Sequence, residues 1–161
     1  MGDSCHHDHA DPRPSAGLVA AALDRAEARC IREGERMTAP RRRVLELLLA
    51  AGEPVKAYDL IARFGGEGQS AKPPTVYRAL DFLERQGMAH RIASISAYVA
   101  CAGHETAHAA AFLICDCCGA TREVATPAAE GLDKAAAAAG YAIERTTIEA
   151  HGRCPACLSA A

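Results

Sequence analysis

The chain has 161 residues, a formal net charge of −2 and a composition in which hydrophobic residues make up 50%. This composition excludes a wholly disordered protein, and the length fits one domain or two small ones. No run of about 18 apolar residues is present, so we expect neither a transmembrane helix nor a membrane partner. The opening residues MGDSCHHDHADP lack the apolar core of a signal peptide, which predicts a cytoplasmic location.

Charge and cysteine are distributed unevenly along the chain. Residues 16–93 carry 13 Lys and Arg against 10 Asp and Glu (+3), whereas residues 94–161 carry 4 against 7 (−3). Residues 1–15 hold the remaining charge of −2 and predict a disordered tail rich in His and Asp, either solvated or an auxiliary metal-binding arm. Because thiols stay reduced in a chain without an export signal, the 8 Cys indicate metal binding rather than disulfides.

Four helices and a hairpin are predicted in the first half. Apolar residues recur at helical spacing, with a glycine at or just after each end, in residues 16–33, 38–52, 55–65 and 73–87. Leu18 and Cys30 belong to the apolar stripe of the first helix, and Thr38 is the expected N-cap of the second. Residues 88–103 then predict two short strands around a turn near residues 94–96.

This order of elements is typical of a winged helix-turn-helix domain. The fourth helix is expected to enter the major groove of double-stranded DNA, where arginine can pair bidentately with guanine. Arginines at the start of the second helix can reach phosphates. A winged-helix domain that contacts another protein is the alternative. The candidate DNA-binding residues from this pattern are Thr75, Tyr77, Arg78, Arg41, Arg42 and Arg43.

The second half predicts a small α/β domain. Residues 109–115, 120–126 and 141–152 are expected to be strands, and residues 127–139 an Ala-rich helix before the last strand. These segments contain too few bulky apolar residues for a large core. The domain is therefore expected to need a covalent or metal staple, or a partner subunit.

Two C-x-x-C pairs supply the staple. Cys115 with Cys118 and Cys154 with Cys157 offer four thiolates, the tetrahedral set that zinc prefers in structural sites. Cys117 competes for the site, but the C-x-C spacing that it would use is the less common one. Reduced surface cysteines and a redox-active C-x-x-C are the alternatives.

A second group of possible ligands mixes nitrogen, sulfur and oxygen donors. It consists of His90 and Cys101 near the hairpin, His104 and His108 after it, and Glu123 beyond the first C-x-x-C. Such a site at the junction of two domains could sense zinc, because its occupancy would fix the angle between them. Each His taken singly is more often an ordinary surface residue.

One motif points to a different chemistry. Residues 104–108 match H-E-x-x-H, which in zinc peptidases places two His on a long helix with Glu105 as general base. Here the motif follows Gly103 directly and runs into a predicted strand, so no long amphipathic helix surrounds it. We therefore expect a protein that is not an enzyme and has no small-molecule substrate.

Four segments resemble the ferric uptake regulator superfamily, and most of all its zinc uptake regulator branch. They are AYDL (57–60), AKPPTVYRALDFL (71–83), FLICDCCG (112–119) and IEAHGRCPAC (148–157). The resemblance covers about residues 16–158 and implies an α+β fold. Its expected parts are a winged helix-turn-helix DNA-binding domain (16–93), a hinge (94–102) and a small α/β zinc-binding dimerisation domain (103–161).

The resemblance also implies residue roles. Cys115, Cys118, Cys154 and Cys157 match structural zinc ligands, and Tyr58 and Arg78 match residues that contact operator purines. The regulatory zinc ligands that it implies are His90, Cys101, His108 and Glu123, with His104 as a rival for the third position. Two Zn²⁺ per subunit are therefore expected.

The function implied is a zinc-responsive transcriptional repressor, with zinc as co-repressor, that controls zinc homeostasis. It would act as a homodimer on an A·T-rich palindromic operator. Iron-sensing members carry an H-H-D-H run before the first C-x-x-C, where this chain has AAAFLI. This difference favours zinc over the alternatives of iron, manganese or peroxide sensing.

Overall fold

The structure of the protein is a computed structural model that describes residues 13–65, 72–101, 110–124 and 128–159. The described residues form two compact units, one within residues 11–103 and the other within residues 104–161. The greater part of the predicted tail, together with His104 and His108, lies outside the described residues. None of the described helices is both long enough and apolar enough to cross a bilayer.

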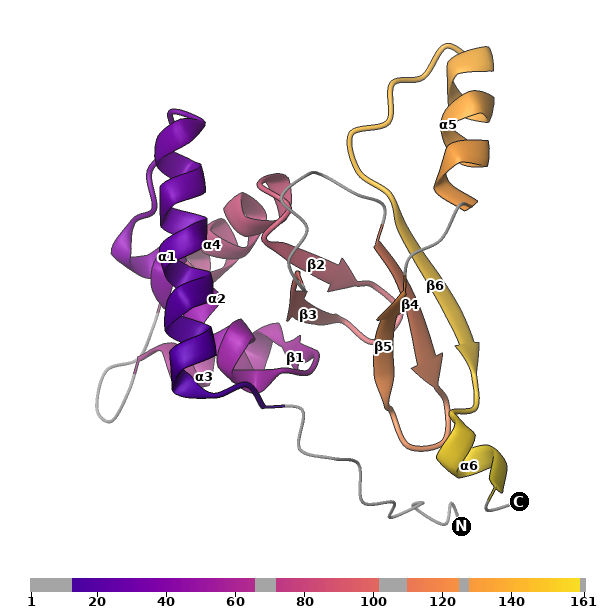
Figure 1. Ribbon diagram of the computed structural model, residues 1–161, viewed down its shortest axis with the longest axis horizontal. Coiled ribbons are helices and arrows are strands. Elements are labelled where there is room, and N and C mark those ends of the chain that lie inside the picture. The colour runs from indigo at the N-terminus through magenta and orange to yellow at the C-terminus, as the bar shows by residue number, and fades with distance from the viewer. Residues whose placement is uncertain (1–12, 66–71, 102–109, 125–127, 160–161) are drawn as a thin grey trace. The chain divides into compact units, whose positions relative to one another are not determined.

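The N-terminal unit is a winged helix (Figure 1). Its helices are α1 (Ala16–Arg32), α2 (Ala39–Ala51), α3 (Ala57–Phe64) and α4 (Pro73–Arg85). A three-stranded sheet of order β1-β3-β2 is built from β1 (Val55–Lys56), β2 (Ala89–Ile92) and β3 (Ala97–Ala100). The predicted winged helix-turn-helix order is therefore confirmed.

Local signals place the helix ends. The Ser15 hydroxyl accepts a hydrogen bond from the Leu18 amide at the start of α1, at 3.4 Å. Gly52 and Gly87 follow α2 and α4 with φ of 65° and 61°, a left-handed conformation that glycine adopts without strain. Thr38 is the N-cap of α2, as expected, but its side chain makes no capping hydrogen bond.

The core of this unit lies between the helices and the sheet. Cys30 is fully buried, which confirms its assignment to the apolar stripe of α1. The assignment of Leu18 was wrong: 63% of its surface is exposed, and Val19 is buried in its place. Helices α2, α3 and α4 contribute most of the core's large, fully buried side chains: Val44, Leu48, Leu60, Val76, Leu80, Phe82 and Leu83.

The strand β1 was not predicted, because residues 55–65 were assigned to one helix. Val55 and Lys56 instead pair with Tyr98 and Ala97 of β3. A strand of two residues has no alternation to detect, and its hydrogen-bond partner comes some forty positions later in the chain. Tertiary pairing thus decides the conformation of this segment.

The C-terminal unit is a second three-stranded sheet with two helices (Figure 1). Its elements are β4 (Ala110–Cys115), β5 (Thr121–Val124), α5 (Ala128–Ala138), β6 (Thr147–Gly152) and α6 (Pro155–Ser159). The strand order is β5-β4-β6, with β5 antiparallel and β6 parallel to β4. The last strand begins at residue 147 rather than 141, and α6 was not predicted.

The parallel pairing of β4 and β6 positions the cysteines. Its register runs from Ala110 opposite Thr147 to Cys115 opposite Gly152, so both strands end at the same edge of the sheet. The turn after β4 and the segment after β6 therefore leave this edge side by side. Cys115 is the last residue of β4 and Cys118 lies in the turn after it, whereas Cys154 and Cys157 both lie in the segment after β6.

Candidate metal centre and DNA-contacting surface

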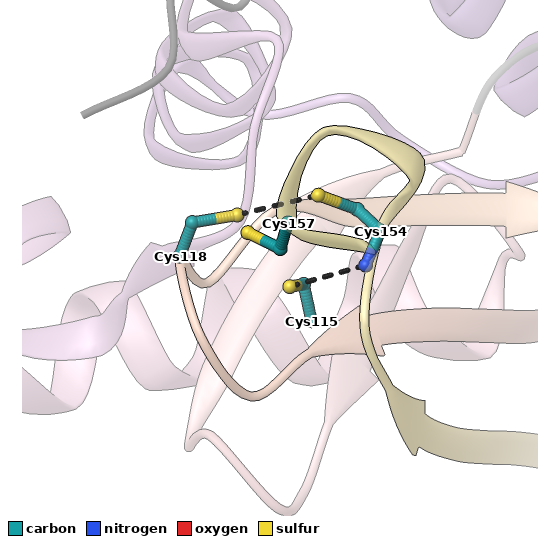
Figure 2. A group of neighbouring side chains, drawn as sticks. All are labelled: Cys115, Cys118, Cys154 and Cys157. Carbon is teal, nitrogen blue, oxygen red and sulfur yellow. Dashed lines mark hydrogen bonds between the residues drawn. The ribbon is translucent and has the colours of Figure 1, made fainter. Parts of the chain in front are cut away.

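Four cysteine side chains converge at the edge where β4 and β6 end, as Figure 2 shows. Their sulfur atoms all lie within 4.8 Å of one another, and the Cys118 and Cys154 sulfurs are 3.7 Å apart. A tetrahedral site with Zn–S bonds of about 2.3 Å requires sulfurs about 3.8 Å apart. The group Cys115, Cys118, Cys154 and Cys157 therefore fits a zinc ion.

Backbone hydrogen bonds hold the two halves of this group. The Asp116 amide donates to the Gly152 carbonyl across the sheet edge, at 2.8 Å. The Gly119 amide donates to the Cys115 carbonyl at 2.9 Å, and Gly119 has a φ of 75°, so the turn closes tightly at this glycine. The Leu158 amide donates to the Cys154 carbonyl and starts α6.

All four of these thiols are less exposed than a surface cysteine, two being buried and two half-buried. Cys115 and Cys157 are only 4% and 3% exposed, whereas Cys117 is exposed and lies outside the four-sulfur group. No disulfide joins any of the cysteines in the described part of the chain. Four thiolates this close, two of them buried and two half-buried, would repel one another strongly unless a cation neutralised them. This donor set therefore suits a soft divalent metal ion.

The thiols differ in acidity. Backbone amides at Cys118 and Cys154 lower the pKa of Cys115 to about 6, and the Cys154 amide lies 3.3 Å from the Cys115 sulfur. Burial and the neighbouring Cys154 thiol instead raise the pKa of Cys157 far above its usual range. One thiolate is thus available near neutral pH, and the other thiols must lose protons as a metal binds.

We expect this difference to be measurable in the metal-free chain. As the pH rises from 5 to 7, about one thiolate should form, detected by its ultraviolet absorbance, and Cys115→Ser should remove it. The folded state favours the thiolate, so it gains stability as the pH rises from about 6 toward the usual 9.0. That gain is lost as the pH falls through 6. A first thiolate that forms only near pH 9 would contradict this prediction.

The second predicted ligand group is divided between the two units. His90 lies on β2 and Cys101 directly follows β3, and their donor atoms lie within 4.8 Å of each other. Both side chains are half-buried. Glu123 lies on β5 of the C-terminal unit. His90 and Cys101 thus supply one nitrogen and one sulfur donor. A metal bound to them would need further donors to complete its coordination.

The predicted DNA-contacting residues of α3 and α4 lie largely at the surface. Tyr58 on α3 is 79% exposed, and Tyr77 on α4 is 45% exposed. Arg78 is also exposed, and Thr75 in the first turn of α4 is half-buried. Large exposed aromatic side chains beside arginine are typical of a binding surface rather than of a core.

The arginines of α2 have partners within their own unit. The Arg41 guanidinium lies 3.5 Å from the centre of the Phe82 ring and donates to the Arg36 carbonyl. Arg42 forms long ion pairs with Asp24 and Glu27, at 3.9 and 3.8 Å. Arg41 therefore packs against α4 through a cation–π contact, which no pattern in the sequence indicated.

A winged helix followed by a sheet domain with four convergent thiols defines a metal-binding protein with a nucleic-acid-binding fold. Residues 32–151 match the ferric uptake regulator family. The chain belongs to this family.

Zinc regulators are among the proteins similar to this chain. It is 41% identical over 138 residues to the zinc uptake regulation protein of Escherichia coli strain K12. The aligned residues cover 84% of this chain and 81% of that protein. A zinc uptake regulator complexed with zinc and DNA superposes with a TM-score of 0.79 at 38% identity, covering 91% of this chain and 98% of the other. Holo XcZur gives a TM-score of 0.75, also at 38% identity, covering 86% and 98%.

Proposed function

We propose that this protein is a zinc-responsive, DNA-binding transcriptional repressor of zinc uptake and homeostasis genes, with zinc as its co-repressor. The observation that carries the proposal is the convergence of four thiols in a chain whose other unit is a winged helix. The similarity to zinc uptake regulators, one of them complexed with zinc and DNA, supports the same activity here. Such a regulator acts on DNA in the cytoplasm and needs no catalytic site.

Cys115, Cys118, Cys154 and Cys157 would hold a structural zinc ion. The closeness of their four sulfur atoms, with 3.7 Å between those of Cys118 and Cys154, supports this assignment. The C-terminal unit has few large buried side chains, among them Phe112 and Ile114, and a metal staple offsets such a small core. The four residues would thereby hold the ends of β4 and β6 together.

His90, Cys101, His108 and Glu123 would form a second, regulatory zinc site. The proximity of the His90 and Cys101 donor atoms supports two of these ligands. His108 is proposed from the family resemblance, with His104 as the rival. Because Glu123 belongs to the C-terminal unit, a four-ligand site of this kind would restrict the angle between the units. Two zinc ions per subunit are thus expected.

Zinc dependence of DNA binding would follow from that restriction. If the liganded arrangement is the one that binds DNA, zinc and DNA favour the same conformation, and each raises the affinity of the other by the same factor. A shift of the conformational population from about 1:99 to about 99:1 requires about 5.5 kcal/mol of differential binding. Thiolate and imidazole ligands bind zinc only when deprotonated, so the affinity of the regulatory site for zinc falls at low pH.

The partner would be double-stranded DNA, contacted from α3 and α4. Tyr58 and Arg78 would contact bases, and Thr75 and Tyr77 would lie beside them. Arg42 would reach phosphates more readily than Arg41, because the pairs that Arg42 makes are long and exposed. Exposed apolar side chains in the C-terminal unit, such as Leu113 and Tyr141, favour a homodimer. A homodimer would bind a palindromic, A·T-rich operator.

A mobility-shift titration tests the proposal. The purified chain is mixed with an A·T-rich palindromic duplex in the presence of zinc, iron, manganese or a chelator. Of the three metals, only zinc should produce a specific complex of the protein with the duplex, and the chelator should abolish that complex. A complex that forms equally well with chelator would reject zinc as co-repressor. Selective formation with iron or manganese would assign the protein to another sensor of the same family.

Arg78→Ala is expected to weaken specific operator binding by about 1–3 kcal/mol, because a bidentate contact to a base is lost. Zinc content should be unchanged. Arg85→Ala is the matched control, since it removes the same charge from the exposed far end of α4. Competition with unrelated DNA in mobility-shift assays measures the effect. Equal losses for the two variants would mean that Arg78 acts only through its charge.

A further inference from the structure

Asp116 and His151 connect the two halves of the four-cysteine group from outside. Asp116 directly follows the ligand Cys115, and His151 lies on β6, where it is paired in register with Ile114 of β4. The His151 Nδ1 and Asp116 Oδ1 atoms are 2.9 Å apart. Neither residue belongs to the four-sulfur group, and the side chains of His151 and Asp116 are 40% and 62% exposed.

The direction of this hydrogen bond follows from the donors available. An ionised carboxylate only accepts, so the Nδ1 atom of His151 carries the hydrogen that it donates to Asp116. A neutral imidazole with this tautomer and a charged imidazolium both supply that hydrogen. The contact therefore forms without a change in the charge of His151.

The Asp116–His151 hydrogen bond lies where the two cysteine-bearing segments must stay together. Cys118 and Cys154 are 36 residues apart in sequence, and the ladder between β4 and β6 ends at Cys115 and Gly152. A metal with two ligands on each segment leaves when these segments separate. At this end of the ladder, the Asp116–His151 hydrogen bond adds a side-chain link to the backbone hydrogen bond from Asp116 to Gly152.

We propose that Asp116 and His151 are a positioning pair that holds the two C-x-x-C segments together and thereby slows the loss of zinc from the four-cysteine site. This inference rests on the proposed structural zinc site. A hydrogen bond between exposed side chains adds little to the free energy of unfolding. It can nevertheless slow metal exit, because the segments must separate locally before the ligands are lost.

The rate of zinc release into an excess of a chromophoric chelator tests this pair. The full-length chain is used with Cys101→Ser as background, which removes a ligand of the proposed regulatory site, so the zinc released comes from the four-cysteine site. His151→Ala and Asp116→Ala should each accelerate release about two- to fivefold, the range that one contact between exposed side chains can contribute. The double variant should be no faster than either single variant, because the two residues act through one contact.

Conservative variants separate the hydrogen bond from a general effect on folding. His151→Asn keeps an N–H donor near the position of Nδ1, and Asp116→Asn keeps the Oδ1 acceptor, so both should release zinc nearly as slowly as the parent. Arg122→Ala, which removes an exposed side chain from β5, is the control and should release zinc at the parent rate.

The possible results are distinguishable. Parent-like release from His151→Ala and Asp116→Ala would overturn the inference, and so would a double variant whose acceleration is the product of the two single effects. His151→Asn as fast as His151→Ala would also overturn it. Elemental analysis of the parent tests the underlying site: a chain without zinc would reject the proposed structural site, whereas zinc that leaves every variant at one rate rejects only the positioning pair.

Discussion

Cys101→Ser is expected to abolish the zinc dependence of operator binding while the chain stays folded. Cys101 follows β3 with its sulfur near a donor atom of His90, and it is the proposed thiolate of the regulatory site. Serine does not ionise near neutral pH, so the site loses its strongest zinc donor. Operator affinity measured with zinc should then fall to the value of the zinc-free protein, a loss of about 5–150-fold if the coupling has the usual size.

The control for this experiment is Cys117→Ser, which changes an exposed thiol outside the four-sulfur group. It should bind operator with the parent's zinc dependence. Elemental analysis should show one zinc fewer for Cys101→Ser and no change for Cys117→Ser. A Cys101→Ser protein that still requires zinc for operator binding would remove Cys101 from the sensor.

Cys115→Ser is expected to have the largest effect on stability. The Cys115 sulfur is buried within the four-thiol group and accepts a hydrogen bond from the Cys154 amide. Zinc binding supplies about 10–16 kcal/mol in small structural sites, and most of it is lost when one of four thiolates is missing. We expect a destabilisation of the C-terminal unit above about 4 kcal/mol, the range reached by loss of a metal site.

Chemical denaturation followed by circular dichroism, with zinc analysis of the same samples, measures this effect. Cys117→Ser is again the matched control, because it makes the same change two residues away, in the turn after β4. Loss of zinc and a fall in the midpoint of the first unfolding transition should occur together in Cys115→Ser. An unchanged denaturation curve would show that the four thiols are not a staple.

Sequence periodicity predicted the elements that depend on local signals. The helices α2 and α4 have a proline in the first turn and a glycine within two residues of the end, and the pairing of β2 with β3 follows from a short hairpin. Spacing also grouped the two C-x-x-C pairs, because four thiolates have few other uses in a reduced chain. For these features, local chemistry and the final fold favour the same conformation.

The features that the sequence did not reveal depend on contacts between distant residues. The strand β1 exists because β3 pairs with it, and residues 147–152 form β6 because they pair with Ala110–Cys115 of β4. The Arg41–Phe82 contact and the Asp116–His151 hydrogen bond likewise join residues from different elements. Only the three-dimensional pairing identifies such partners.

Because β4 and β6 pair in parallel register, the proposed metal centre is complete only in correctly folded molecules. An unfolded chain can offer zinc either cysteine pair, but all four sulfurs meet only after these strands have paired in the correct alignment. A misaligned or partly assembled molecule would retain the ion weakly and yield it to competing cellular chelators. Tight retention would therefore mark those molecules whose last strand has reached its proper neighbour.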